Sequence, residues 1–466
     1  MTGPLSFAIH QRSATCAARR GVVRTLHGAF DTPAFMPVGT RASVKGVLPH
    51  QVAQSGAQIL LNNTYHLLLR PGPELVRSMG GVHRFMGWPG PILTDSGGYQ
   101  AYSLADSNSV DDDGVTFKSI IDGKMIRMTP EDATRVQNAL GADIMMAFDD
   151  CPPPMTTRAS ESGIAGDAVD KRLAAVLRRD KVAYQTEVMP VGNLHKNREN
   201  PPPALGSQRA RSKGTIDHAQ RLAIANERTI RWLERCNQAH ARKDEQSLFG
   251  IVQGGLDLAQ REWCATRVAA IELPGYAIGG VAVGETSDDI AKVVRHTAPL
   301  LPDAKPRYLM GVGYERDLLA AVRAGVDMFD CVLPTRNGRN ANAFTSSGQI
   351  RLRNSKYAQD QSPIEAGCDC LVCAGPSGAE WGNWHPMNAV HATLATQALA
   401  PIYVGHFTRG YIRHLFMVGE MLGPMLVTIH NLRHFQRFMA DIRATINTDD
   451  WTSLVARWPI AAAGMT

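Results

Sequence analysis

The sequence predicts an α/β fold, a (β/α)8 TIM barrel in which eight parallel strands alternate with helices. Eight short apolar runs recur along the chain, at 34–38, 59–61, 91–94, 144–148, 248–252, 276–280, 307–310 and 327–329. Most are separated by stretches with helical spacing, for example Leu222, Ala225, Thr229, Trp232, Leu233 and Cys236. Strands joined by helices run parallel, and eight of them can close into a barrel.

Polar residues at the ends of the runs predict where the chemistry lies. They are Asp95, Asp149, Gln253, Gly280 and Asp330. Barrels of this kind carry their active sites at the carboxyl ends of the strands. Each residue alone could be an ordinary turn residue, but five at corresponding strand ends indicate one shared site.

The most informative of these residues is Asp330, which lies where a buried run meets a basic loop. Pro334 stops the run, and Arg336 and Arg339 follow within nine residues. Arginines beside a carboxylate favour an anionic partner such as a phosphate. The alternative is that Asp330 caps a turn or pairs with one of these arginines.

Composition indicates a large globular protein with its surplus charge concentrated in one segment. The chain has 466 residues, 44% of them hydrophobic, and a net charge of +6. Residues 155–214 hold 11 Lys or Arg against 6 Asp or Glu, nearly the whole surplus, and one short helix is expected at 168–184. We interpret this segment as an insertion in the barrel, either following an RNA backbone or simply solvated.

The ends of the chain predict additions to the barrel. Alternating segments at 6–10 and 21–27 indicate two antiparallel strands that form a lid. Helical spacing at 411–419 and 426–446 predicts two helices near the end of the chain. We therefore expect N-terminal strands over 1–30, the catalytic barrel over 31–345, a metal-binding subdomain over 346–435 with an insertion at about 374–406, and a C-terminal helix over 436–466.

Three of the eight cysteines predict a metal site. Cys368, Cys370 and Cys373 have the short spacing with which one loop can place three thiolates around a tetrahedral Zn²⁺. The spacing leaves the fourth ligand open among His385, His391, His406, His414, His430 and His434. Four protein ligands would make the zinc structural. Scattered remaining cysteines, and the lack of a signal peptide or membrane span, favour a reducing cytoplasm.

Several segments together resemble the signature motifs of tRNA-guanine transglycosylases. They include Thr94-Asp-Ser-Gly-Gly-Tyr-Gln100, Phe148-Asp-Asp-Cys151, Gly250-Ile-Val-Gln-Gly-Gly255, Tyr276-Ala-Ile-Gly-Gly-Val-Ala-Val-Gly-Glu285, Tyr308-Leu-Met-Gly-Val-Gly313, Phe329-Asp-Cys-Val-Leu-Pro-Thr-Arg336 and Thr428-Ile-His-Asn431, with the cysteine cluster. The similarity covers nearly the whole chain outside 155–214 and 374–406. It implies an enzyme that exchanges guanine at the tRNA wobble position for a 7-deazaguanine base through a covalent intermediate, in queuosine biosynthesis.

The resemblance also implies roles for individual residues. The nucleophile is expected at Asp330 and the proton acceptor at Asp95. Base binding is expected at Asp95, Ser96, Gly97, Gly98, Tyr99, Asp149, Gln253, Gly279, Gly280 and Met310. RNA contacts are expected at Gly311, Val312, Gly313, Tyr314, Glu315, Arg316, Asp317, Thr335, Arg336, Asn337, Gly338 and Arg339. Among the six histidines, the resemblance selects His430 as the fourth zinc ligand, and it implies a homodimer.

Details of the motifs favour the bacterial branch, which uses 7-aminomethyl-7-deazaguanine. Cys151 and Val283 match the residues associated with that smaller base. The chain departs from the family's usual residues at Tyr99, Asp150 and Val281, and Asp150 is one methylene shorter than the usual glutamate. Two other hypotheses stay open here: a catalytically inactive tRNA-binding subunit, and a barrel hydrolase that acts on free nucleosides.

Overall fold

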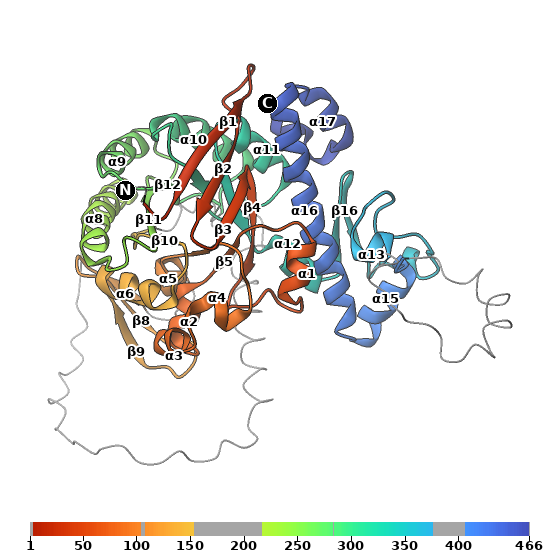
Figure 1. Ribbon diagram of the computed structural model, residues 1–466, viewed down its shortest axis with the longest axis horizontal. Helices are drawn as coiled ribbons and strands as arrows, with labels where there is room; N and C mark the ends of the chain where they lie inside the picture. Colours follow the sequence, from red (N-terminus) through yellow and green to blue (C-terminus); the bar gives the residue numbers. More distant parts are fainter. Residues whose placement is uncertain (1–2, 104–107, 153–216, 283, 376–405, 466) are drawn as a thin grey trace, which may run out of the picture. The chain divides into compact units, whose positions relative to one another are not determined.

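The computed structural model describes residues 3–103, 108–152, 217–282, 284–375 and 406–465 (Figure 1). Contacts divide the chain into two units, 1–153 with 222–466, and 154–221. The first unit contains the barrel. The basic insertion and the helix predicted within it lie outside the described residues, as do Val283 and most of the insertion predicted at 374–406.

Eight parallel strands close into a barrel, as predicted. They are β4 (Ala34–Gly39), β5 (Leu60–Asn62), β6 (Ile92–Thr94), β10 (Ile144–Met146), β11 (Ser247–Val252), β12 (Gly275–Ile278), β13 (Arg307–Leu309) and β14 (Met328–Cys331). The last strand pairs with the first, with Met328 opposite Ala34. Each strand coincides with one of the eight apolar runs, because both faces of a barrel strand are buried and most of its positions are therefore apolar.

Helices follow the barrel strands and surround them (Figure 1). They are α1 (Pro49–Gln54), α2 (Thr64–Leu69), α3 (Pro73–Ser78), α4 (Gly81–Met86), α5 (Gly98–Ser103), α6 (Pro130–Leu140), α8 (His218–Ala239), α9 (Leu258–Ala270), α10 (Ser287–Thr297), the 3-10 turn η1 (Ala298–Leu300), α11 (Glu315–Arg323) and α12 (Leu333–Arg339). Between β6 and α6 lies a small sheet of β7 (Asn108–Val110), β8 (Val115–Lys118) and β9 (Met125–Met128).

Local sequence explains several helix starts. The Thr129 hydroxyl accepts from the Asp132 backbone N–H, and the Asp132 carboxylate accepts in return from the Thr129 N–H. Thr286 and Asp289 form the same reciprocal pair at α10. Asp257 accepts from Ala259 and Gln260 at the start of α9. These side chains satisfy backbone donors that a helix leaves unpaired in its first turn.

The N-terminal lid has one strand more than predicted. It is an antiparallel sheet of β1 (Ser6–Arg12), β2 (Arg19–Thr25) and β3 (Gly28–Thr32). The third strand follows a two-residue turn, and a single residue, Pro33, separates it from β4. Because both connections are so short, the sequence pattern did not resolve it as a strand of its own. Val23 and Phe30 pack with the side chains inside the barrel. The fully buried Arg19 pairs with Asp327 at 2.6 Å, just before β14, so the sheet closes the amino end of the barrel.

The C-terminal part packs against the barrel through one long helix. Its elements are the hairpin β15 (Asn342–Thr345) and β16 (Gly348–Arg351), η2 (Ser355–Tyr357), α13 (Leu371–Ala374), α15 (Arg409–Val418), α16 (Leu422–Thr448), α17 (Trp451–Arg457) and η3 (Pro459–Met465). Helix α16 contacts α12, β15 and β4. It runs unbroken across position 435, where the sequence analysis places a boundary. No helix in the described part of the chain is long and apolar enough to cross a membrane.

Candidate active site

A cavity of about 250 Å³ opens at the carboxyl ends of the barrel strands. Parallel strands in a closed barrel all end at the same rim, so residues distant in sequence meet there. Nine of the residues predicted for catalysis and base binding line this cavity: Asp95, Ser96, Tyr99, Asp149, Gln253, Gly279, Gly280, Met310 and Asp330. Gly97 and Gly98 lie behind it at the start of α5, where a Cβ on Gly97 would lie 3.0 Å from the Tyr65 nitrogen.

Asp330 is held by one of its two carboxylate oxygens. Oδ1 accepts from the Tyr308 hydroxyl at 2.6 Å and from the Gly311 backbone N–H at 2.8 Å. Burial raises the pKa of Asp330, while the tyrosine and the amide lower it. Among the described residues none donates to Oδ2, so one oxygen of a fixed carboxylate is available to react.

Asp95 faces the same cavity from the end of β6. Its Oδ1 accepts from the Thr64 N–H at 2.7 Å, and its Oδ2 accepts from the Asn63 side-chain amide. Burial raises the pKa of Asp95 to about 6, and the charge of Asp330 adds to the rise. A carboxyl group with such a pKa can give or take a proton near neutral pH.

Asp149 and Gln253 form a polar wall of the cavity. The Gln253 Nε2 donates to Asp149 Oδ2 at 2.6 Å, and the Ser96 hydroxyl donates to Oδ1 at 3.3 Å. Burial raises the pKa of Asp149 to about 6. The buried Gln253 Oε1 has no hydrogen-bond partner among the described residues. The wall therefore offers carboxylate and amide groups to a flat, polar ligand.

Glycine is required where β12 ends. Gly280 has φ +62, and a Cβ there would lie 2.1 Å from Gln253 Oε1. A Cβ on Gly279 would lie 2.7 Å from Ile251 Cγ2. The two glycines thus bring backbone groups to the cavity wall in a conformation that a side chain would block.

Arg261, which supports this turn, was not predicted as a site residue. The Arg261 side chain is fully buried on α9 and donates to the carbonyls of Gly279 at 2.6 Å and Gly280 at 2.9 Å, and also to those of Val252 and Gly255. An arginine on a helix usually reaches solvent, so the sequence around Arg261 gave no indication that its side chain is buried at the site. Tyr308 and Asn63, which hold the two catalytic carboxylates predicted above, were also missed as site residues because they lie in or beside runs interpreted as strands.

Most of the predicted RNA-contacting residues line a second cavity of about 610 Å³ beside the first: Gly311, Val312, Gly313, Tyr314, Arg316, Asp317 and Arg336. Arg339 is exposed nearby on α12, and Asn337 is partly exposed. Glu315, Thr335 and Gly338 are buried. Glu315 pairs instead with His434 at 2.6 Å, and Gly338 packs against Thr428 of α16. These three residues therefore lie behind the rim of this cavity, and their contact with RNA stays a prediction.

The four predicted metal ligands meet in one buried cluster. The Sγ atoms of Cys368, Cys370 and Cys373 lie 3.7, 3.6 and 3.4 Å from His430 Nδ1. The other ring nitrogen, Nε2, lies 2.7 Å from the Phe344 carbonyl oxygen, which fixes the ring. His434 pairs with Glu315 and His406 with the Gln361 carbonyl. The cluster could hold a metal ion.

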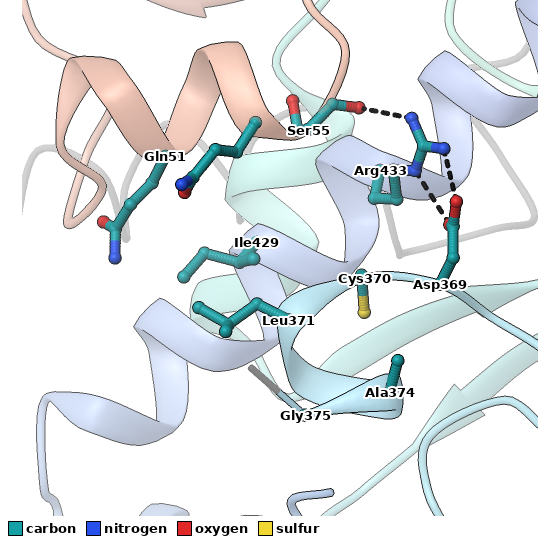
Figure 2. A pocket seen from close by; sticks show the side chains of 10 residues that line it. Gln51, Ser55, Asp369, Cys370, Leu371, Ala374, Gly375, Ile429 and Arg433 are labelled. Carbon is teal, nitrogen blue, oxygen red and sulfur yellow. Dashed lines mark hydrogen bonds and ion pairs between the residues drawn. The ribbon is translucent and has the colours of Figure 1, made fainter. Parts of the chain in front are cut away.

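A cavity of about 380 Å³ separates this cluster from α1 (Figure 2). On its wall the Arg433 guanidinium bridges two parts of the chain. It donates to both carboxylate oxygens of Asp369, at 2.8 and 2.5 Å, and to the Ser55 carbonyl at 3.2 Å. The cysteine loop is therefore tied to α1 of the barrel through α16.

Comparison with known proteins agrees with the geometry. The family model described as "Queuine tRNA-ribosyltransferase" matches residues 14–171 and 213–461. A queuine tRNA-ribosyltransferase of Herpetosiphon aurantiacus is 42% identical over 441 residues, which are 95% of this chain and 89% of the relative. Those of Gloeobacter violaceus and Thermus thermophilus are both 40% identical and cover 98% and 95% of this chain, and 97% and 90% of the relatives.

Proposed function

Because this chain belongs to the queuine tRNA-ribosyltransferase family, we propose that it exchanges guanine at the wobble position of tRNA for 7-aminomethyl-7-deazaguanine, a step of queuosine biosynthesis. The observation that carries the proposal is that two carboxylates, the half-buried Asp330 and the buried Asp95, face one cavity at the carboxyl ends of the barrel strands. Among the described residues none donates a hydrogen bond to Oδ2 of Asp330, and burial raises the pKa of Asp95 to about 6.

Asp330 acts as the nucleophile. Its Oδ2 forms a bond to C1′ of the ribose while the bond from C1′ to N9 of guanine breaks, and the electron pair leaves with the base. Tyr308 and Gly311 hold Oδ1 and orient the attack. The covalent ester divides one difficult displacement into two easier ones. Attack by the incoming base then breaks the ester and restores the original anomeric configuration.

Asp95 moves the proton. In its protonated form it supplies a proton to the departing guanine, and as the carboxylate it accepts the proton that the incoming base loses from N9. The contacts from Asn63 and Thr64 hold the carboxyl group in place during both steps. A pKa of about 6 keeps both forms accessible at neutral pH.

The polar wall of the cavity recognises the base. Asp149 as a carboxylate accepts from N1–H and the exocyclic amine, which distinguish guanine and its 7-deaza analogues. Gln253 and the Gly280 N–H complete the wall around O6. Tyr99 and Met310 lie on the lining and offer flat or soft surfaces for a base taken out of its stack. The exposed Arg336 and Arg339 contact the RNA backbone.

Substitution of Gly280 should impair base binding. In Gly280→Ala the new Cβ would collide with Gln253 Oε1, and the backbone would be strained at φ +62. We expect KM for guanine to rise at least about tenfold, which corresponds to the loss of one hydrogen bond to the base. Initial rates at varied guanine concentration measure this. Gly123→Ala is the control, since Gly123 has φ +76 but lies in the turn between β8 and β9. An unchanged KM in Gly280→Ala would remove Gly280 from the base pocket.

The cysteine cluster holds one structural Zn²⁺. Tetrahedral zinc with bonds of about 2.3 Å to sulfur and 2.05 Å to nitrogen separates the two donor atoms by about 3.6 Å, and the observed separations from His430 Nδ1 are 3.4 to 3.7 Å. Soft thiolates and an imidazole suit zinc. The ion would fasten the cysteine loop to α16 and would leave no open coordination position for chemistry.

Removal of one zinc ligand should destabilise the fold around the cysteine loop and α16 and should not alter the catalytic residues of the barrel. We expect Cys370→Ser protein to lose its zinc and to lose on the order of 3 kcal/mol or more of unfolding free energy. Metal analysis and denaturant titration measure both. Cys16→Ser, which changes a cysteine outside the cluster, should keep its zinc and its stability. A Cys370→Ser protein with one equivalent of zinc contradicts the assignment.

Two further properties belong to the proposal. The chain acts in the cytoplasm, where its tRNA substrate is found, and it forms a homodimer. Met417, Val418 and Met421 are 56%, 56% and 79% exposed where α15 leads into α16, and an apolar patch of this kind favours a protein contact. Sedimentation equilibrium of the purified protein tests the dimer.

Incubation with unmodified tRNA and labelled guanine tests the function. A transglycosylase incorporates the label into tRNA, and unlabelled 7-aminomethyl-7-deazaguanine then prevents incorporation. An inactive tRNA-binding subunit binds the tRNA without incorporation, and a nucleoside hydrolase releases base from free nucleosides. Either of the last two results overturns the proposal.

A further inference from the structure

We propose that Arg228 is a positioning residue for base recognition, which holds the Asp150 carboxylate away from the base pocket so that, of these two consecutive carboxylates, only Asp149 faces the base. The inference rests on the proposed function of this cavity. Arg228 lies on α8, far in sequence from Asp150, and it touches neither the base nor the ribose.

Asp149 and Asp150 are consecutive, buried, and directed to different partners. Their exposed fractions are 8% and 4%. Asp149 lines the cavity and contacts Ser96 and Gln253. The Asp150 Oδ2 instead lies 2.5 Å from Arg228 Nη1, and the Asp150 backbone N–H donates to the Thr229 hydroxyl at 3.1 Å. Helix α8 therefore fixes the peptide on which Asp149 is carried.

Arg228 is itself held in place. Its Nε and Nη2 donate to Asp112 Oδ1 at 3.2 and 3.1 Å, in the turn between β7 and β8. The Trp232 indole N–H, one turn further along α8, donates to the Asp112 carbonyl at 2.8 Å. The Arg228 side chain is only 10% exposed. A buried arginine whose planar guanidinium is held in one orientation can orient the carboxylate that it pairs with.

The charge of Arg228 matters for Asp149. Burial raises the pKa of Asp149, and the neighbouring charge of Asp150 raises it further. While Arg228 neutralises Asp150, that second effect is limited. Other charged groups also lie near this pair. Asp112 pairs with Arg228 and Arg231, Arg261 and Glu285 lie near Cys151, and Asp95 and Asp330 line the same cavity as Asp149. Of these, only Arg231 is substituted in the test, as a control.

Without Arg228, the buried Asp150 carboxylate loses its ion pair with the guanidinium. We expect the Asp149 carboxylate to hold its proton to higher pH, by about one unit. Because only the carboxylate can accept both guanine N–H groups, binding of guanine should weaken on the acid side.

Equilibrium dialysis of labelled guanine against the full-length protein between pH 5 and 8.5 tests the inference. For Arg228→Gln we expect the dissociation constant to rise about five- to tenfold below pH 6 and to approach the wild-type value above pH 8, which is a one-unit shift of the midpoint. Asp150→Asn alone should move the midpoint downward. Arg228→Gln with Asp150→Asn removes both charges and should restore the wild-type curve within about twofold.

Arg231→Gln is the matched control, because Arg231 lies on the same helix and also donates to Asp112. Its curve should match wild type. A double variant that binds as weakly as Arg228→Gln, or a folded Arg228→Gln protein with an unshifted curve, overturns the inference. If Arg228→Gln does not fold, Asp150→Asn and the double variant decide it, since neither keeps the Asp150 carboxylate after its ion pair with Arg228 is lost. Wild-type protein that exchanges no guanine into tRNA contradicts the proposed function instead.

Discussion

Asp330→Asn should abolish exchange of labelled guanine into tRNA, with a loss of at least about 10⁴-fold in rate, the size seen when a covalent nucleophile is removed. The amide is nearly isosteric with the carboxylate and its oxygen can still accept from Tyr308 and Gly311. It cannot form the ester with C1′. The loss therefore reports on the nucleophile and not on the shape of the cavity.

The covalent intermediate gives this prediction a second readout. Wild-type protein incubated with tRNA and then denatured should show a protein–RNA adduct on a denaturing gel, and Asp330→Asn should show none. Asp244→Asn, which changes an exposed carboxylate outside the site, should behave as wild type in both assays. Exchange by Asp330→Asn at a rate near wild type would falsify the assignment, and an adduct without exchange would place the nucleophile elsewhere.

The barrel and the residues on its rim could be predicted because each depends on a local sequence pattern. A buried strand leaves an apolar run, and Asp95, Asp149, Gln253 and Asp330 each follow such a run directly. The cysteine spacing is equally local. The choice of His430 over five other histidines came from the resemblance, because no local pattern tells which helix packs on the cysteine loop.

The residues that support the site could not be predicted in this way. Arg228 and Arg261 lie on helices, where an arginine is ordinarily a surface residue. Each is buried because a carboxylate or several carbonyls from distant segments surround it. Such a role depends on the tertiary fold. The same reason explains Glu315, predicted to contact RNA from its place in a loop motif but buried against His434.

Asp95→Asn should slow exchange roughly 10²- to 10⁴-fold, the contribution of a positioned acid–base group. Unlike Asp330→Asn, it should still form the adduct with RNA, although more slowly, because the nucleophile is intact. The hydrogen bonds can be kept. The oxygen of the introduced amide accepts from the Thr64 N–H, and Asn63 turns its own amide so that its oxygen accepts from the new side chain.

The same substitution should stabilise the fold at neutral pH, which separates a catalytic loss from misfolding. The pKa of Asp95 is raised from 3.8 to about 6, first by burial. The folded state therefore holds the proton more tightly than the unfolded state, so the favourable effect of Asp95 on stability is present below pH 4 and is lost as pH rises through 6. At pH 7 to 8 the buried charge costs up to about 3 kcal/mol of unfolding free energy.

The introduced amide carries no charge and avoids that cost. Denaturant unfolding at pH 8 should show Asp95→Asn to be more stable than wild type, by up to about 3 kcal/mol, and the difference should shrink toward zero between pH 6 and pH 4. Asp244→Asn should show no such pH-dependent gain. An Asp95→Asn protein that is less stable than wild type at pH 8 would mean that the cavity stabilises the Asp95 carboxylate. An Asp95→Asn protein as active as wild type would mean that another group moves the proton.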